Sequence, residues 1–346
     1  MTNRERFVAT MDGRTPDRIP YLAYGGYVRD NNRHLWAPLI DRGLIVMPRV
    51  NDVAVTADGV EDTVTVTYDA RGYAVERRVL RTSVGELSQV RVHGWTQEYF
   101  IKTPGDYRVM KYILEHTQLT PDFGGFAEAE RTVGDTGATI VRAERSPMQK
   151  VIVDYAGLAN YSYHLTDAPV EMNALLEAYE DYALRYFTIL ADHPSRYIQI
   201  PENLTSEQTG PARFIQHHIP FYNKIIPMLH AKGKKVFAHY DGRFACLIDL
   251  IPQTGLDGLE SFTAPPEGDI GYGRARAALP DTTFMAHIRL SDYKLPPGDL
   301  KKLLHGYIRE AAPDGRNLLF ELSEDLPANW QESIPAALDA INDYKI

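Results

Sequence analysis

The chain has 346 residues, 44% of them hydrophobic and 24% charged, and these proportions exclude collagen, coiled-coil and intrinsically disordered chains. The 37 Lys and Arg residues against 46 Asp and Glu give a net charge of −9, which disfavours binding to nucleic acid or an anionic membrane surface. Cys246 is the only cysteine, so intrachain disulfides and multi-thiolate metal sites are excluded. We find no secretory signal and no run of 18 apolar residues, and we expect a cytoplasmic protein.

The first hundred residues change character twice. The N-terminus predicts a charged helix, a turn at Thr15-Pro16-Asp17, and a buried strand over residues 18–24. Residues 51–100 alternate polar and apolar side chains, are rich in Thr and Val, and contain glycine turns. This pattern is typical of antiparallel strands. We interpret it as an insertion in, or a lid over, a larger domain.

From residue 103 onward, strands and helices alternate. Either Thr103 or Asp106 is expected to cap the first of these helices. Strand-like runs lie at 138–143, 197–202, 235–240, 256–262, 283–288 and 318–322. Helices are expected at 170–192, 211–232, 243–254, 272–279, 298–311 and 330–343. With the strand at 18–24 and an eighth expected at 149–155, the repeats predict an α/β fold: a single (β/α)₈ TIM barrel over residues 1–346 with the β insertion at 51–100.

An active site in such a barrel lies at the carboxyl ends of the strands. Ionisable or amide side chains follow five successive predicted strands: Glu202 and Asn203, His239 and Asp241, Glu260, His287, and Glu321 and Glu324. A carboxylate at a buried strand end is costly unless it is paired, protonated or metal-bound. We therefore take Glu202, Asp241 and His287 as candidate catalytic residues. Asn203, Tyr240 and Arg29 are candidate substrate-binding residues.

Each residue also has a structural interpretation. His239 is explained equally well as a hydrogen-bonded core histidine, and Asp241 as the N-cap of the next helix. His287 fits a supporting role beside the reacting groups. Glu321 is interpreted as structural, whereas Glu324 lies in the loop SEDLPAN and is the better functional candidate.

Regular spacing suggests a metal site. His218, His239 and Glu260 are 21 residues apart, a spacing that one barrel repeat produces, and Glu324 is an alternative third ligand. Three nitrogen or oxygen ligands with an open fourth position suit catalytic zinc. Coincidence is the alternative, because the chain has 11 His and 46 acidic residues and His218 lies in a predicted helix.

Several segments together resemble the uroporphyrinogen decarboxylase superfamily. These are TNRERFVATMDGRTPDRIP at the start, TSVGEL, PENLTSEQTGP, the run from FYNKIIPMLH through HYDG to GLESFTAPPEGDI, and LSEDLPANWQESI near the end. The resemblance implies a (β/α)₈ barrel that either decarboxylates a tetrapyrrole or transfers methyl groups to or from a corrinoid. The arginine-bearing motif of the decarboxylases is absent, although Arg29 and Arg33 lie near its place.

The methyltransferase branch is the more similar one. Its zinc-dependent members that methylate coenzyme M use a His-x-Cys pair and a distant cysteine. Here His239 is retained, Asp241 takes the place of the first cysteine, and SED at residues 323–325 lies near the second. Oxygen ligands disfavour thiol activation and favour polarising an oxygen or nitrogen substituent. The resemblance thus points to the demethylating members.

We therefore expect a methyltransferase that takes a methyl group from a small methoxylated or N-methylated compound and passes it to a corrinoid, with zinc assisting. The corrinoid (cobalamin) would be supplied by a partner protein or bound from solution, and a homodimer is expected from the resemblance. Neither nucleic acid nor a membrane is expected as a partner. The alternatives are a cofactor-free decarboxylase or lyase using Arg29 and Arg33, and a non-catalytic barrel that binds a tetrapyrrole or aromatic ligand.

Overall fold

The computed structural model describes residues 1–346, which divide into two compact units. The first unit comprises Met1–Asp52, Phe123–Ala143 and Ala191–Ile346, and the second comprises Val53–Asp122 and Glu144–Leu190. None of the helices combines the length and the apolar character needed to cross a bilayer.

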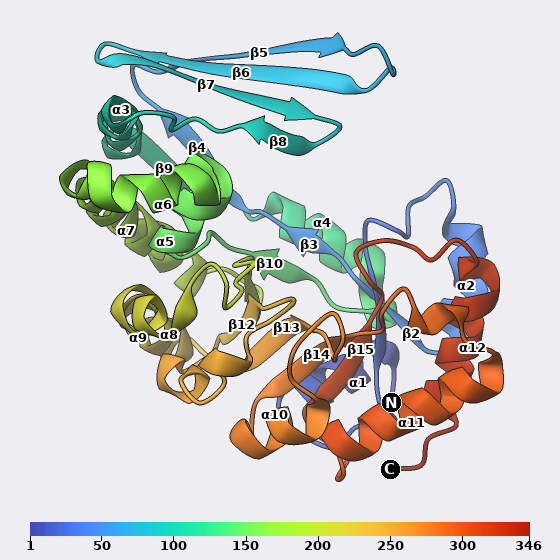
Figure 1. Ribbon diagram of the computed structural model, residues 1–346. Coiled ribbons are helices and arrows are strands. Elements are labelled where there is room, and N and C mark those ends of the chain that lie inside the picture. The colour runs from blue at the N-terminus through green and yellow to red at the C-terminus, as the bar shows by residue number, and fades with distance from the viewer. The chain divides into compact units, whose positions relative to one another are not determined.

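The first unit is built on a parallel sheet whose strands follow one another nearly in chain order (Figure 1). Its order is β2-β1-β15-β14-β13-β12-β11-β10-β3. The strands are β1 (Tyr21–Tyr24), β2 (Leu44–Met47), β3 (Arg49–Val50), β10 (Ile140–Arg142), β11 (Tyr197–Ile200), β12 (Lys235–His239), β13 (Gly258–Phe262), β14 (Thr283–His287) and β15 (Leu318–Glu321). The sequence prediction of an α/β barrel is confirmed.

The two ends of this sheet meet at Pro48. β2 pairs with β1, whereas β3 pairs with β10, and only Pro48 separates β2 from β3. Proline has no N–H to donate, so it interrupts the ladder. The backbone nitrogen of Ala138 nevertheless donates to Val46 O at 3.2 Å, and that of Ile140 to Pro48 O at 2.9 Å. β2 and β3 therefore act as one strand, and eight strand positions surround the barrel.

The eighth strand is not the one expected from the sequence. Residues 149–155, predicted as a strand from their β-branched side chains, are helical: α5 (Pro147–Lys150) continues into a π-helical turn at Val151–Ala156. Pro147 occupies the first helical positions, where its fixed φ and missing N–H favour helix initiation. The start signal Ser146-Pro147 thus outweighs the strand propensity of the valines and isoleucine that follow.

Helices of the first unit are α1 (Asn3–Met11), α2 (Arg33–Asp41), α4 (Gly124–Val133), α8 (Gly210–Arg213), α9 (Ile219–Ala231), α10 (Tyr272–Ala278), α11 (Pro297–Ala311) and α12 (Trp330–Asn342). A π-helical turn, Phe214–His218, joins α8 to α9. The helix expected at 243–254 is wrong, because only two 3-10 turns form there, at Ala245–Leu247 and Ile251–Thr254. Pro252 lies at the start of the second turn and lacks a backbone donor.

The barrel core is apolar on its inner face. Phe7 and Met11 of α1 belong to the same buried cluster as Tyr197 and Phe237, which lie on β11 and β12. The rings of Phe7 and Tyr197 meet edge to face with centroids 5.2 Å apart. The N-terminal helix therefore packs against the barrel interior, and the polar side chains that follow the strands lie at the opposite, carboxyl ends.

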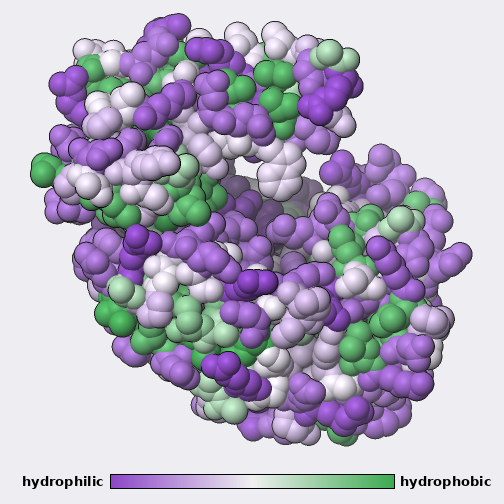
Figure 2. All heavy atoms as spheres, in the orientation of Figure 1, coloured by the Kyte–Doolittle hydropathy of each residue, from purple (hydrophilic) through white to green (hydrophobic).

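The second unit contains the antiparallel strands expected between residues 51 and 100. β5 (Glu61–Tyr68), β6 (Ala74–Thr82), β7 (Gly85–Val92) and β8 (Trp95–Glu98) form a four-stranded meander, and β4 (Val53–Ala57) pairs with β9 (Thr117–Pro121). The helices of this unit are α3 (Pro104–Glu115), α5, α6 (Gly157–Asp167) and α7 (Pro169–Ala191). Hydrophobic side chains lie among hydrophilic ones on the meander (Figure 2), where Val66, Tyr68 and Trp95 are exposed.

Candidate active site

His239 and Glu260 form the centre of the candidate site. His239 ends β12, Glu260 lies in the middle of the adjacent strand β13, and the two are directly opposite in the parallel register. His239 Nδ1 lies 2.5 Å from Glu260 Oε2, and both side chains are buried. Burial favours a neutral ring, but Glu260 and Asp241 outweigh it and raise the pKa of His239 to about 10. The same contact holds the pKa of Glu260 below its ordinary value despite burial.

A β-bulge at Ser261 shapes the site. The register of β13 and β14 shifts between Glu260 and Phe262, and Ser261 has a φ of 64°, which is uncommon for a residue other than glycine. Its Oγ lies 3.1 Å from His239 Nδ1 and 3.1 Å from His287 Nε2. The bulge thus directs one hydroxyl between the two imidazoles, and such backbone strain is typical of functional sites.

The pKa values of His287 and Glu321 are shifted in the opposite directions from those of His239 and Glu260. His287 Nε2 lies 3.3 Å from Glu321 Oε1 and 3.0 Å from the Tyr24 hydroxyl. Burial lowers the pKa of His287 to about 4, so its ring is neutral near pH 7. Burial together with the charge of Glu260 raises the pKa of Glu321 well above its ordinary value. The Oε1 of Glu321 accepts from the backbone N–H of Ser261 at 2.8 Å.

Arg49 reaches across the barrel to this cluster. In the ring of eight strand positions, β3 and β13 stand on opposite sides, yet Arg49 Nη1 lies 3.8 Å from Glu260 Oε1. The Arg49 guanidinium also lies 4.1 Å from the centre of the Tyr24 ring. The Tyr24 hydroxyl donates to Glu260 Oε1 at 3.1 Å. Glu260 therefore has a cationic neighbour on each side and a phenol donor as well.

The second ring nitrogen of His239 faces Asp241 and Glu324. His239 Nε2 lies 3.6 Å from Asp241 Oδ1 and 3.9 Å from Glu324 Oε1. His239 Nε2 and Asp241 Oδ1 are buried and have no hydrogen-bond partner. Burial opposes ionisation of Asp241, but His239 outweighs it and keeps the pKa of Asp241 below its ordinary value. Two polar atoms at the barrel mouth are thus available to a ligand.

The structure contains no complete metal site: no group of three or more His, Cys, Asp or Glu side chains is arranged to hold an ion. The residues at the mouth fit a zinc ion only in part. Two ligands of one tetrahedral zinc, bound at 2.0–2.1 Å, stand about 3.3 Å apart, close to the spacing of His239 Nε2 and Asp241 Oδ1. Glu324 is the third candidate, with 61% of its side chain exposed.

The predicted residues Glu202, Asn203, His218 and Tyr240 lie around a second group of contacts. Tyr222 of α9 donates to Glu202 Oε1 at 2.7 Å and lies 3.1 Å from the Tyr240 hydroxyl. His218 stacks on Phe214, and burial lowers its pKa to about 3. The backbone N–H of Asn203 donates to His239 O at 3.1 Å. Of the four predicted metal ligands, Glu260 lies at Nδ1 of His239 and Glu324 faces Nε2 of the same ring. The fourth, His218, packs on Phe214 instead.

Arg29 lines a cavity of about 460 Å³ in the first unit. The lining residues are Tyr24, Gly25, Gly26, Tyr27, Arg29, Arg49, Asn51, Arg142 and Glu324. Tyr27 fixes one wall, because its hydroxyl donates to the backbone carbonyl oxygens of Ser323 and Glu324. The cavity therefore shares Tyr24, Arg49 and Glu324 with the cluster around His239.

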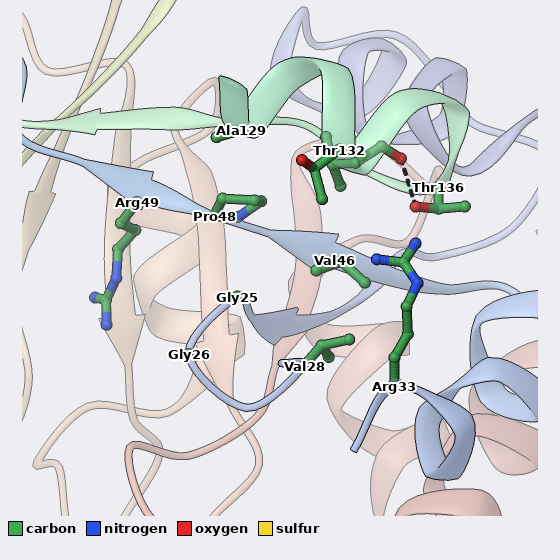
Figure 3. Close-up of a pocket in the computed structure, with 11 residues that line it drawn as sticks. Gly25, Gly26, Val28, Arg33, Val46, Pro48, Arg49, Ala129, Thr132 and Thr136 are labelled. Carbon is green, nitrogen blue, oxygen red and sulfur yellow. Dashed lines mark hydrogen bonds between the residues drawn. The ribbon is translucent and has the colours of Figure 1, made fainter. Parts of the chain in front are cut away.

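A smaller cavity of about 260 Å³ adjoins it and shares Gly25, Gly26 and Arg49 (Figure 3). Figure 3 shows Arg33 reaching from the start of α2 toward Val46 and Thr136. Gly25 permits close packing here, since a Cβ at this position would lie 2.8 Å from Pro48 Cα. Arg33 thus belongs to a different cavity from Arg29, although the two residues are close in sequence.

Sequence reasoning did not find Tyr24, Arg49, Arg142 and Ser261. Arg49 directly follows the apolar run LIVMP, which is the signal that identified Glu260, but residues 44–50 were not predicted to form a strand. Tyr24 ends a predicted strand and was passed over as an apolar core residue. No local signal marks Ser261, because its position depends on the bulge.

The fold and this mouth define an α/β barrel with buried acids and imidazoles, and more exposed arginines, at the carboxyl ends of its strands. No protein-family model matches the chain, and no curated protein matches it in sequence. Its fold is similar to that of a methyltransferase from Methanosarcina mazei, with 11% identity over 99% of this chain and 98% of that chain and a TM-score of 0.58.

Two glycoside hydrolases were also found, each with 11% identity and a TM-score of 0.40. One is a family 5 enzyme from Prevotella bryantii, and the match covers 89% of this chain and 85% of that chain. The other is a family 5 broad-specificity endoglucanase from an uncultured bacterium, and the match covers 98% of this chain and 88% of that chain.

Proposed function

We propose that the protein is a methyltransferase of the uroporphyrinogen decarboxylase superfamily that removes a methyl group from a small methoxylated or N-methylated compound. The methyl acceptor is the Co(I) of a corrinoid, supplied by a partner protein or from solution. The fold of the Methanosarcina mazei methyltransferase over nearly the full length of both chains supports this proposal. The sequence motifs around His239 and Asp241 support the same branch.

The observation that carries the proposal is the orientation of His239. Glu260 holds Nδ1 at 2.5 Å, so Nε2 is directed to the mouth, where it has no hydrogen-bond partner. A carboxylate on one imidazole nitrogen fixes the ring, and the other nitrogen can carry a proton or, once a metal displaces that proton, act as a ligand. Glu260 is therefore assigned to orienting His239 rather than to contacting the substrate.

Methyl transfer from oxygen or nitrogen needs help at the leaving atom. The methyl group moves to Co(I) without its bonding electrons, and the oxygen or nitrogen keeps the pair. That atom must accept a proton or a Lewis acid as the bond breaks. His239 Nε2, Asp241 Oδ1 and Glu324 Oε1 are the groups that would hold zinc, which when bound would polarise the leaving atom. His287 would orient the donor or move its proton.

The test is methyl transfer to cob(I)alamin, followed by its absorption spectrum, with a panel of methoxylated and N-methylated compounds. Purified protein is expected to contain about one zinc per chain, and chelation is expected to abolish transfer. His239→Ala and Asp241→Asn should lose both metal and activity. Glu260→Gln should weaken metal binding or activity by roughly 10- to 100-fold, because the orienting charge is lost.

His230→Ala is the matched control, since His230 pairs with Asp257 and lies 40% exposed on α9. It should retain both zinc and activity. Metal-free protein that transfers methyl groups at full rate would exclude the zinc assignment. A protein that transfers no methyl group from any donor class would exclude the function.

Decarboxylation is the second candidate, and the arginine-lined cavity favours it, because a decarboxylase must bind the carboxylate of its substrate. The two candidates differ in product. A decarboxylase releases CO₂ from a carboxylate substrate without zinc or corrinoid, whereas the proposed methyltransferase leaves the carbon skeleton intact. Assay of CO₂ and methylated corrinoid from the same incubation separates them.

A further inference from the structure

The outer strand of the four-stranded meander has an open edge. The order of this sheet is β5-β6-β7-β8, so β5 has one neighbouring strand and its other side carries unpaired backbone N–H and C=O groups (Figure 1). Seven of the eight residues of β5 are exposed. An exposed edge of this length can pair with a strand of another chain.

The two edges of the meander differ. β8 has only four residues, and the register of β7 and β8 shifts between Val90 and Arg91. Short edge strands and bulges prevent edge-to-edge pairing. β5 has neither, because it pairs with β6 at eight consecutive positions without a shift, and its sequence contains no proline and no lysine. The edge at β8 is therefore protected, whereas the edge at β5 is not.

The centre of β5 reads the same in both directions. Residues 63–67 are Thr-Val-Thr-Val-Thr, all of them uncharged and β-branched. We consider two copies of β5 that run antiparallel about a twofold axis at Thr65. Val64 is then opposite Val66 of the second copy, and Thr63 is opposite Thr67. Each residue of the segment thus meets one of its own type, and β-branched pairs of this kind favour a sheet.

The exposed apolar side chains of β5 share one face. Side chains alternate along a strand, so Val64, Val66 and Tyr68 lie on the same side of the sheet. They are 51%, 53% and 73% exposed. In the twofold pair the apolar stripes of the two copies adjoin, because the valines are opposite each other across the axis. Removing this surface from water favours association.

The charged ends of the strand are compatible with the same pairing. Glu61 of one copy is opposite Asp69 of the other, which by themselves would repel. In each copy, however, Arg81 lies 3.6 Å from Glu61 and Arg71 lies 3.2 Å from Asp69. Each carboxylate therefore brings its own arginine to the contact, and the arginines offset the repulsion.

We propose that β5 is a contact between two copies of this chain, which pair antiparallel about Thr65 and join their two meanders into one continuous sheet. A second copy is the occupant because the strand is complementary to itself. The contact contains no residue of the candidate active site.

Position-specific disulfides test this pairing in the full-length chain. Cys246→Ser removes the only cysteine, which is exposed. In that background Thr65→Cys places two thiols opposite each other at a Cα separation of about 4.5–5.5 Å, within the range of disulfides. Oxidation with copper phenanthroline should then give a linked dimer on a non-reducing gel. Thr67→Cys is the matched control and should give little dimer, because its two copies stand about 13 Å apart.

Light scattering tests the same contact without an oxidant. Val66→Lys places a charge in the apolar stripe and should halve the mass measured for the unchanged protein. Val55→Lys is the control and should leave the mass unchanged, because Val55 is 51% exposed but lies on β4, outside the meander.

Three results would each overturn the proposal. They are a single-chain mass for the unchanged protein, equal linking of Thr65→Cys and Thr67→Cys, and an unaltered mass for Val66→Lys. The linking experiment does not depend on Val66→Lys, so a variant that fails to fold leaves the pairing testable.

Discussion

At the scale of single residues, the barrel mouth shifts the pKa values of neighbouring ionisable groups in opposite directions. His239 and Arg49 hold the pKa of Glu260 below its ordinary value, whereas burial and the charge of Glu260 raise that of Glu321. Two interacting carboxylates in a desolvated site oppose each other's ionisation. The two acids of the mouth are therefore not equivalent.

His218 gives a pH-dependent prediction. Burial lowers its pKa to about 3, so the folded protein keeps the ring neutral where the unfolded chain binds a proton. The contribution of His218 to the free energy of unfolding is therefore fully present above the unfolded pKa of about 6.5. It is lost as the pH falls toward 3, by up to about 1.4 kcal/mol per pH unit. Urea unfolding between pH 7 and 4 should show a shallower decline in His218→Phe than in the unchanged protein. Identical slopes would contradict the prediction.

The sequence identified the acids and imidazoles at this scale because a polar side chain after a buried strand is a local signal. Glu260, His239 and His287 were found in this way. Their partners Arg49 and Ser261 were not, since one depends on a strand broken by Pro48 and the other on a bulge in β13.

At the scale of elements, caps and breaks determine where helices form. The sequence left open whether Thr103 or Asp106 caps α3. In the structure Thr103 is the N-cap residue, and the carboxylate of Asp106, three residues later, accepts from the backbone N–H groups of Lys102 and Thr103 at 2.8 and 2.7 Å. Pro147 acts in the same local way and starts a helix that was not predicted. Caps and helix starts involve only a few neighbouring residues, so they can in principle be read from the sequence. The helix start at Pro147 was missed because the residues that follow it also favour a strand.

Asp106→Ala tests the cap of α3. The substitution leaves two N–H groups at the start of the helix without their carboxylate, and we expect a loss of about 1–2 kcal/mol in the free energy of unfolding. Asp106→Asn keeps an acceptor and should lose less. Hydrogen exchange of α3 amides, together with urea unfolding, measures both variants. An Asp106→Ala protein as stable as the original would show that the cap contributes nothing.

At the scale of the whole molecule, each of the two units has its own buried polar group. In the second unit Lys150 Nζ lies 2.7 Å from Glu144 Oε2 and 3.1 Å from Asp154 Oδ2. The Tyr179 hydroxyl donates to the same Glu144 oxygen at 3.1 Å. Burial disfavours the charged lysine, but the two carboxylates outweigh it and raise the pKa of Lys150 well above its ordinary value.

Lys150→Met tests this group. It leaves the half-buried Glu144 carboxylate without its cation, whereas Asp154 keeps Arg145 at 3.3 Å. We expect a loss of about 2 kcal/mol in the free energy of unfolding, the size of a hydrogen bond to a charged group. Hydrogen exchange should increase in Val53–Asp122 and Glu144–Leu190, which form the second unit. Lys111→Met is the matched control: Lys111 pairs with Glu115 on the exposed face of α3, and its loss should cost at most about 0.5 kcal/mol. Equal effects of the two substitutions would refute the prediction.

The sequence by itself determined the alternation of strands and helices, the antiparallel excursion, and the polar residues that end the later strands. These follow from periodicity and from turn and cap signals, which act over a few residues. The tertiary structure alone decided which segment completes the barrel and how Tyr24 and Arg49 meet Glu260. It also placed Arg142 beside Arg49. Those contacts join residues up to 236 positions apart, and only closure of the sheet brings their strands to one mouth.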